Sequence, residues 1–178
     1  ESRGLGDVYK RQILYSGLIN GDTFSGTYTG AFNNANAGTG KTVTITPSYT
    51  GADVNNYSIT NHSTITADVA VKALTATASA VNKTYDGTTT ATTTLTFTGL
   101  VGSETLGQTV GSTFNNKNVG TGKTVTVNSI TLANGSNGGL AANYSISPGQ
   151  TTTANVTAKA LTVSGITASN KTYDGNTC

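Results

Sequence analysis

Apolar and polar residues alternate along several short stretches of the chain, with the period of two that is typical of half-buried β-strands. In KTVTIT, Val43 and Ile45 would lie on one face and the Thr residues on the other, and KTVTVN repeats this pattern around Val125 and Val127. TTLTFTG and NYSIS alternate in the same way, and clusters of Gly and Asn separate the strands. Apolar residues at helical spacing do not occur. The pattern therefore predicts an all-β protein with minimal helix.

Nearly the whole chain is one sequence written twice. FNNANAGTGKTVTI from Phe32 recurs as FNNKNVGTGKTVTV from Phe114, 82 residues later. After a loop expansion of five residues in the second copy, NYSI recurs at a distance of 87, as does KALT from Lys72 to Lys159. A fixed period with loop-sized changes in length indicates tandem copies of one module.

A repeat of this length is large enough to be a small domain with its own core. We expect residues 13–71 to be a first repeat that lacks its N-terminal strand and YDG segment, residues 72–158 to be a complete repeat, and residues 159–178 to begin a third. Residues 1–12 match nothing in the next copy and are interpreted as a non-native leader, and Cys178 also departs from the pattern. The junction before each KALT contains no Pro or Gly, which predicts a stiff connection between repeats.

Each repeat is predicted to be a small antiparallel β-sandwich of the immunoglobulin-like type, with about seven short strands. β-Grasp-like modules and a continuous β-solenoid are the alternatives. A solenoid requires coils that repeat every 20–30 residues or so, and the sequence shows no such shorter period.

Composition indicates an extracellular protein with a polar surface. About a fifth of the residues are Thr, only 10% are charged, and the formal net charge is +2. Thr favours strands, whereas the abundant Gly and Asn favour turns. The low charge argues against a nucleic-acid or membrane-surface partner, and a single Cys leaves no disulfide framework.

The segment GTGKT, at residues 38–42 and 120–124, is similar to part of a phosphate-binding loop. Such a loop needs a Gly five residues before the Gly-Lys pair, where this chain has Ala35 and Lys117. It also needs a helix N-terminus for the anion, and here an alternating strand follows. We interpret GTGKT as a turn whose Lys enters a strand.

Groups for acid–base chemistry are sparse. His62 is the only histidine and has no counterpart in the second copy. Asp22 and Glu104 are equivalent acids, one in each repeat, and are expected in a hairpin loop. A general base found in one copy only is a poor catalytic device. The sequence therefore predicts no enzyme, no cofactor and no metal site.

The tripeptide Tyr-Asp-Gly is the most distinctive motif of the repeat. Asp-Gly is expected to form a tight turn that needs a positive φ, while Tyr packs its ring on the module and bonds through its hydroxyl. A calcium or carbohydrate site is the alternative, but calcium needs about six oxygens and this segment offers one carboxylate. We predict a structural motif in both copies: Tyr85, Asp86, Gly87, Tyr173, Asp174 and Gly175.

With YDG, NVGTGKTVTV, NYSI and KALT in a fixed order, the chain resembles the YDG-type repeats of large bacterial surface and secreted proteins, which are related to the MBG-type repeats of filamentous-haemagglutinin-like exoproteins. The resemblance implies stalk or spacer modules of an adhesin at the surface of a Gram-negative cell, exported by two-partner or related secretion. The implied partners are neighbouring repeats of the same chain and, through other parts of the protein, host glycans or matrix. A module that itself binds host glycans or matrix is the alternative function.

Overall fold

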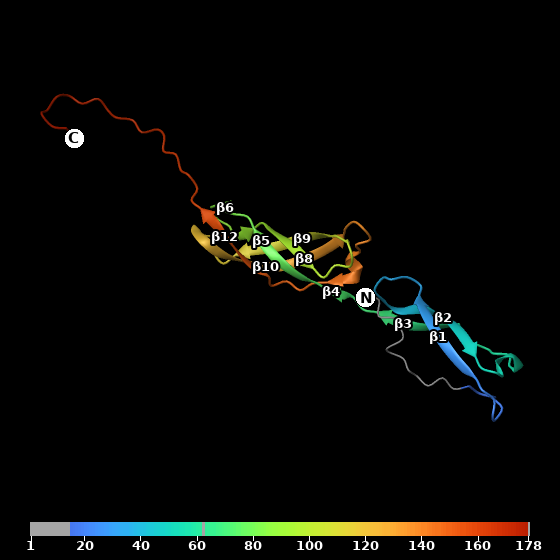
Figure 1. Cartoon of the computed structure of the whole chain (residues 1–178). Coiled ribbons are helices and arrows are strands. Elements are labelled where there is room, and N and C mark those ends of the chain that lie inside the picture. Colours follow the sequence, from blue (N-terminus) through green and yellow to red (C-terminus); the bar gives the residue numbers. More distant parts are fainter. Residues whose placement is uncertain (1–14, 62, 178) are drawn as a thin grey trace. The chain divides into compact units, whose positions relative to one another are not determined.

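A computed structural model describes residues 15–61 and 63–177, and it confirms the all-β fold (Figure 1). Two single turns of 3-10 helix, η2 (Val54–Asn56) and η3 (Ala141–Asn143), are its only helical elements within these ranges. The strands are β1 (Ser25–Phe32), β2 (Gly38–Thr50), β3 (Thr64–Val69), β4 (Lys72–Ala73), β5 (Thr75–Ala80), β6 (Lys83–Thr84), β7 (Thr90–Ala91), β8 (Thr93–Thr98), β9 (Leu106–Phe114), β10 (Gly120–Asn134), β11 (Tyr144–Ser145) and β12 (Thr151–Thr157).

The chain forms two compact units. Of the described residues, the first unit comprises 15–61, 63–74, 99–107 and 133–146, and the second comprises 75–98, 108–132 and 147–177. Strands β1 to β4 and β11 belong to the first unit, whereas β5 to β8, β12 and most of β9 and β10 belong to the second. The interpretation of residues 1–12 as a leader, and the predictions for Cys178 and His62, concern residues outside the described part. The predicted repeat boundaries stay predictions.

In the first unit, β1, β2 and β3 form an antiparallel sheet with β2 in the middle. The alternation in KTVTIT places every second residue on the same face, and Val43 on the central strand is fully buried. The same unit contains a short parallel pair, in which Tyr144 and Ser145 of β11 lie opposite Lys72 and Ala73 of β4.

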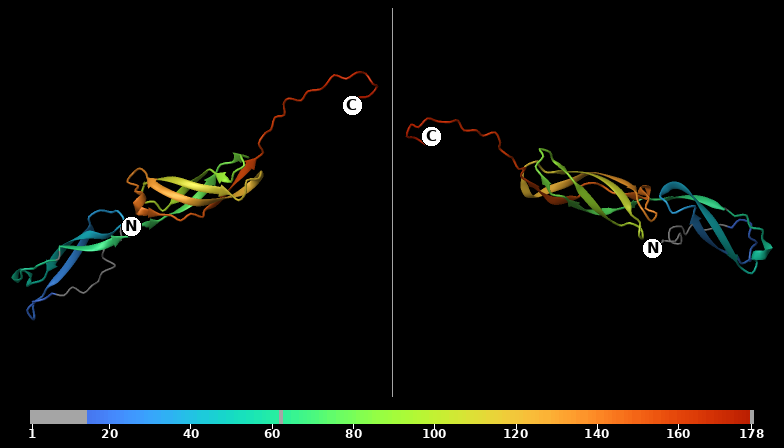
Figure 2. Two further views of the ribbon diagram at one scale, coloured as in Figure 1. Left: turned by 180° about the vertical axis from the view of Figure 1, so that it is seen from behind. Right: turned by 90° about the horizontal axis from the view of Figure 1, so that it is seen from above.

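In the second unit, a five-stranded sheet has the order β6-β12-β10-β9-β7, and β5 pairs with β8 in a separate antiparallel ribbon. Figure 2 gives two further views of these strands. Ala78 and Leu95 of the ribbon share a buried cluster with Val127 of β10, so the ribbon covers one face of the larger sheet. A second cluster joins Phe114 and Val125 to Val156. Two layers with their apolar faces together make a sandwich-like fold, as predicted.

Two details of the predicted sandwich are wrong. The pairs β4–β11 and β6–β12 are parallel, so the sheets are not purely antiparallel. Nine strands, β4 to β12, lie within residues 72–158 where about seven were expected, because four of them are only two residues long. Alternation over five or six residues cannot reveal strands of two residues, which exist only because a neighbouring strand offers them backbone partners. Among the described residues, no helix is long and apolar enough to cross a bilayer.

Candidate functional site

The YDG loop is built around the ammonium group of Lys83, the first residue of β6. Its Nζ lies 2.8 Å from Asp86 Oδ1 and also donates to the carbonyl oxygens of Thr88 and Thr90, at 2.9 and 3.0 Å. The ring of Phe114 lies under the same ammonium, 5.6 Å from Nζ to the ring centroid. The motif is thus KTYDG and not YDG alone. Sequence reasoning missed Lys83, although the Lys recurs before Tyr173.

Asp86 is the acceptor that folds this loop onto itself. Besides Lys83, its Oδ1 accepts the backbone N–H and the hydroxyl of Thr88, both at 2.9 Å. The Lys83 ammonium, followed by the two groups of Thr88, lowers the pKa of Asp86 to about 2. All three donors come from the loop itself and reach one carboxylate oxygen, an arrangement that fits the predicted structural role of Asp86.

Gly87 and Gly175 both have the left-handed backbone that was expected for the Asp-Gly pair, with φ of 82° and 76°. The ring of Tyr85 packs against the cluster of Phe114, and its backbone N–H donates to Thr157. A hydrogen bond of the Tyr85 hydroxyl stays a prediction. For Tyr173 the expected packing is wrong: this side chain is 94% exposed, because no strand of the described residues lies beside it.

The GTGK segments form a bulge and not the expected turn before a strand. Gly38 and Gly120 already belong to β2 and β10, and the register of each strand shifts before its Lys. The Lys then folds back on the preceding loop: Lys123 Nζ donates to both Asn116 oxygens, at 2.7 and 2.5 Å, and to the Asn118 carbonyl.

The first repeat contains the same hydrogen bonds between a lysine and the preceding loop. There, Lys41 donates to both Asn34 oxygens at 2.7 Å and to the Asn36 carbonyl. The bulge amides are also satisfied by the chain itself, since Gly122 N–H donates to Asn155. A phosphate-binding loop leaves backbone amides free to bind an anion. In this segment the ammonium group of the lysine instead donates to oxygen atoms of the preceding loop.

A tyrosine and an acid form a third interaction that both repeats share. The Tyr144 hydroxyl accepts the Val101 N–H at 3.0 Å and donates to Glu104 Oε2 at 2.5 Å. Tyr57 does the same between Ile19 and Asp22. Both acids lie in turns, but the turn with Glu104 joins β8 to β9, which belong to different sheets, so the predicted hairpin loop is wrong there. The tyrosine partners of the two acids were missed.

The recurrence of NYS with an acid some 35–40 residues earlier in both copies was the available signal for this pairing. Hydrogen bonding to Asp22 raises the pKa of Tyr57, and hydrogen bonding to Glu104 raises the pKa of Tyr144.

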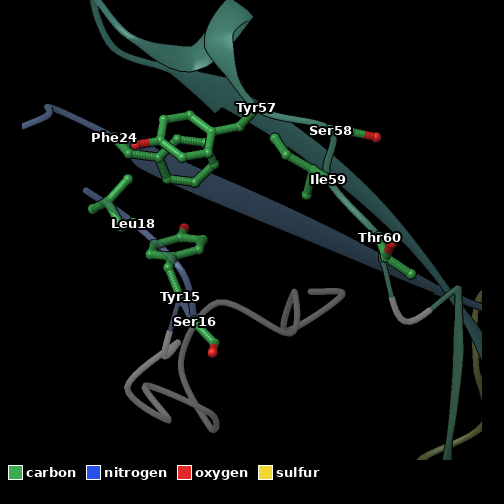
Figure 3. Close-up of a pocket in the computed structure, with 8 residues that line it drawn as sticks. All are labelled: Tyr15, Ser16, Leu18, Phe24, Tyr57, Ser58, Ile59 and Thr60. Atoms are coloured by element: carbon green, nitrogen blue, oxygen red, sulfur yellow. The ribbon is translucent and has the colours of Figure 1, made fainter.

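The first repeat has a pocket of about 400 Å³ that is lined mainly by aromatic and aliphatic side chains. Figure 3 shows the rings of Tyr15, Phe24 and Tyr57 gathered around it with Leu18. Tyr15 and Phe24 stack edge to face, with ring centroids 4.4 Å apart. Ser16, Ser58, Ile59 and Thr60 complete the lining. Among the described residues that line the pocket, tyrosine is the only ionisable type.

Within the described ranges, no three His, Cys, Asp or Glu side chains are grouped so as to hold a metal ion. In comparison with known families, a family model described as the YDG domain matches residues 8–67 and 70–154. No curated protein and no solved structure matches the chain.

Proposed function

Since the chain belongs to the YDG domain family, we propose that its repeats are structural spacer modules in the stalk of a large secreted or surface-exposed bacterial adhesin. The resemblance to the MBG-type repeats of filamentous-haemagglutinin-like exoproteins supports the finer part of this proposal, including export by two-partner or related secretion. The partners of each module are then the neighbouring repeats of the same chain. No catalytic step is part of the proposal.

The proposal rests on how the polar side chains that recur in both repeats are hydrogen-bonded. Lys123 and Lys41 bind loop carbonyls, Glu104 and Asp22 bind tyrosines, and each of these partners belongs to the same repeat as the group that it satisfies. Asp86 is similarly bound by its own loop. Ligand-binding groups are normally left unpaired and convergent, so that the ligand can pair with them. These recurring Lys and acid groups are paired within their own repeat, which supports a role in maintaining its shape.

The proposal is tested by offering the 178-residue chain to immobilised matrix proteins, host cells and a glycan array. We expect binding at background, because the recurring polar groups are already paired. A longer tandem array should behave as a semi-rigid rod in small-angle scattering, because the junctions contain no Pro or Gly hinge.

Saturable binding would contradict the spacer role if it is lost in Asn137→Ala. Asn137 lies in the expanded loop with a positive φ of 57°, and its side chain donates to the Ser103 carbonyl. The control is Lys117→Ala, which alters an exposed residue of a different loop. Such binding would establish the alternative function, a glycan- or matrix-binding module.

A further inference from the structure

One side chain of the complete repeat contacts the loop between β1 and β2 of the first repeat, residues 33–37. Asn143, the last residue of η3, accepts the Ala37 backbone N–H on its Oδ1 at 2.9 Å, and its Nδ2 donates to Asn36 Oδ1 at 3.2 Å. All three residues belong to the first compact unit. The bonded residues are 106 and 107 positions apart in the sequence, so the contact connects two repeats.

The loop that receives Asn143 is shaped by hydrogen bonds within its own repeat. Lys41 Nζ donates to both Asn34 oxygens and to the Asn36 carbonyl. The Asn36 N–H donates to Asn34 Oδ1 at 3.0 Å. None of these bonds uses the Ala37 N–H or the Asn36 side chain. The lysine therefore fixes the loop while leaving both of these groups to bind the next repeat.

Backbone pairing brings both partners to the junction between the repeats. Gly38 pairs with Val69, the last residue of β3, so the loop before Gly38 lies where the chain leaves the first repeat. In the complete repeat, β4 pairs with β11, and Asn143 directly precedes Tyr144 of β11. Tyr144 is buried, and the Asn143 N–H donates to the Leu140 carbonyl at 3.0 Å. Strand pairing and a turn thus hold the two hydrogen-bonding partners in place.

The groups that make this contact recur in the sequence. Asn118 follows Asn36 by 82 residues, and Asn56 precedes Asn143 by 87, the offsets at which the two repeats align. At the third position the first repeat has Ala and the complete repeat has Val119. The group used there is a backbone N–H, which every residue except Pro supplies, so this difference leaves the contact possible. Each repeat therefore contains both halves of the contact.

We propose that the loop held by Lys41 and the Asn of NYS form a head-to-tail interface between successive repeats, in which Asn143 fastens the complete repeat to the first. The partner of this surface is the next repeat of the same chain, recognised by a side-chain carboxamide. The two residues between β3 and β4 are the covalent connection, and Asn143 adds a second attachment at the same junction. A single connection leaves its backbone torsions free to vary, whereas a second attachment restricts them.

This interface deepens the proposed spacer function and rests on it for its consequence, a stiffer array. The contact itself lies within the chain. Saturable binding of a glycan or matrix protein would contradict the spacer role and leave the interface intact, so the two failures can be told apart.

The first test is amide hydrogen exchange at Ala37 in the 178-residue chain, measured by NMR. Asn143→Ala removes the acceptor, so the Ala37 N–H should exchange about tenfold faster or more. Asn143→Asp keeps an acceptor oxygen and should retain the slow exchange. Asn56→Ala is the matched control, since it makes the same change at the equivalent, exposed position of the first repeat and should leave the exchange at Ala37 as it is in the wild-type chain.

The second test measures the spread of distances between the repeats. Spin labels at Thr46 and Lys117, which are both exposed, report one position in each repeat once Cys178 is replaced by Ser. Pulsed dipolar spectroscopy should give a broader distance distribution for Asn143→Ala than for the unsubstituted labelled chain, and Asn56→Ala should not broaden it.

Two results would overturn the proposal. One is equal exchange of the Ala37 N–H in the wild-type chain and in Asn143→Ala. The other is a distance distribution that Asn143→Ala leaves as narrow as it is without the substitution.

Discussion

Lys83 Nζ and Asp86 Oδ1 lie 2.8 Å apart, and this ion pair closes the YDG loop. Lys171 and Asp174 form the same pair at 2.7 Å, with the Asp again accepting a backbone N–H from two residues further on. The second pair forms in a segment that has no strands around it. The loop conformation is therefore a local property of KTYDG, and packing on Phe114 is added only in the complete repeat.

The first prediction concerns acid stability. Because the folded pKa of Asp86 is lowered to about 2, its contribution to stability is fully present above the unfolded value of about 4 and is lost as the pH falls through the folded value. The melting temperature of the wild-type chain should decrease between about pH 4 and pH 2, and Asp86→Asn should lower it at neutral pH and flatten that dependence.

Asp174→Asn is the control for this titration. The pKa of Asp174 is also lowered, first by Lys171, but its segment packs on no strand. This variant should leave the thermal transition unchanged at every pH. An equal effect of both substitutions would show that the dependence comes from general charge and not from the loop in the complete repeat.

The second prediction concerns the turn glycine. A Cβ on Gly87 would meet no atom within 4 Å, so any cost of substitution comes from its φ of 82° and not from a clash. Gly87→Val should destabilise the complete repeat by roughly 1–3 kcal/mol, and Gly87→Asn by less, because Asn tolerates the left-handed region. Urea denaturation measures both. Gly175→Val, at φ 76° in the extended segment, should leave the midpoint unchanged.

The third prediction concerns the buried lysine. Lys123 is 8% exposed and its ammonium satisfies oxygens of Asn116 and Asn118. Lys123→Met keeps the aliphatic length but leaves these acceptors without their donor, which should cost about 1–3 kcal/mol of unfolding free energy. Lys117→Met, in the exposed loop between Asn116 and Asn118, removes an equal charge and should change the unfolding free energy by less than about 0.5 kcal/mol. Similar losses in the two variants would contradict a specific role of the Lys123 ammonium.

The fourth prediction concerns the tyrosine–acid pair. Tyr144→Phe leaves the Val101 N–H and Glu104 without their shared partner, so the melting temperature should fall by several degrees. Adding Glu104→Gln to this variant should have little further effect, since a double-mutant cycle detects a direct contact as non-additivity. Fully additive losses would show that the two side chains act independently.

The same pair predicts a loss of stability in alkali. The hydrogen bond to Glu104 raises the pKa of Tyr144 above its ordinary value of 10. The resulting stability is fully present below that value and is lost as the pH rises through the folded pKa. The stability difference between the wild-type chain and Tyr144→Phe should therefore shrink above about pH 10. Thermal melts of both proteins between neutral and alkaline pH would measure it.

Much of the fold follows from the sequence because its determinants are local. The alternation around Val43 and Val125 places both residues in the core of a sheet, where each is fully buried. The Asp-Gly pair at residues 86–87 needs a positive φ for a steric reason that does not depend on the rest of the chain. The acids Asp22 and Glu104 lie in turns because a turn is set by a few neighbouring residues, although the strands on either side of Glu104 do not form the predicted hairpin.

The candidate site was only partly predictable, because its partners are distant in sequence. Nothing within ten residues of Glu104 indicates that Tyr144 binds it, and the contact exists only after the chain has folded over 40 residues. The parallel pairing of β4 with β11 is non-local in the same way. A strand of two residues is too short to show an alternating pattern. It forms only because a neighbouring strand offers it backbone hydrogen bonds.

Sequence by itself determined the module, its repetition, its β-structure and the glycine at its sharpest turn, because these depend on periodicity and on backbone sterics. Tertiary structure decided where identical segments end up. In KAL at residues 72–74, Lys72 and Ala73 form β4 and Leu74 is buried, whereas the same residues at 159–161 form no strand and Leu161 is exposed. The physical reason is that burial and strand pairing are properties of the neighbours that a segment meets, and a segment does not encode whether those neighbours are there.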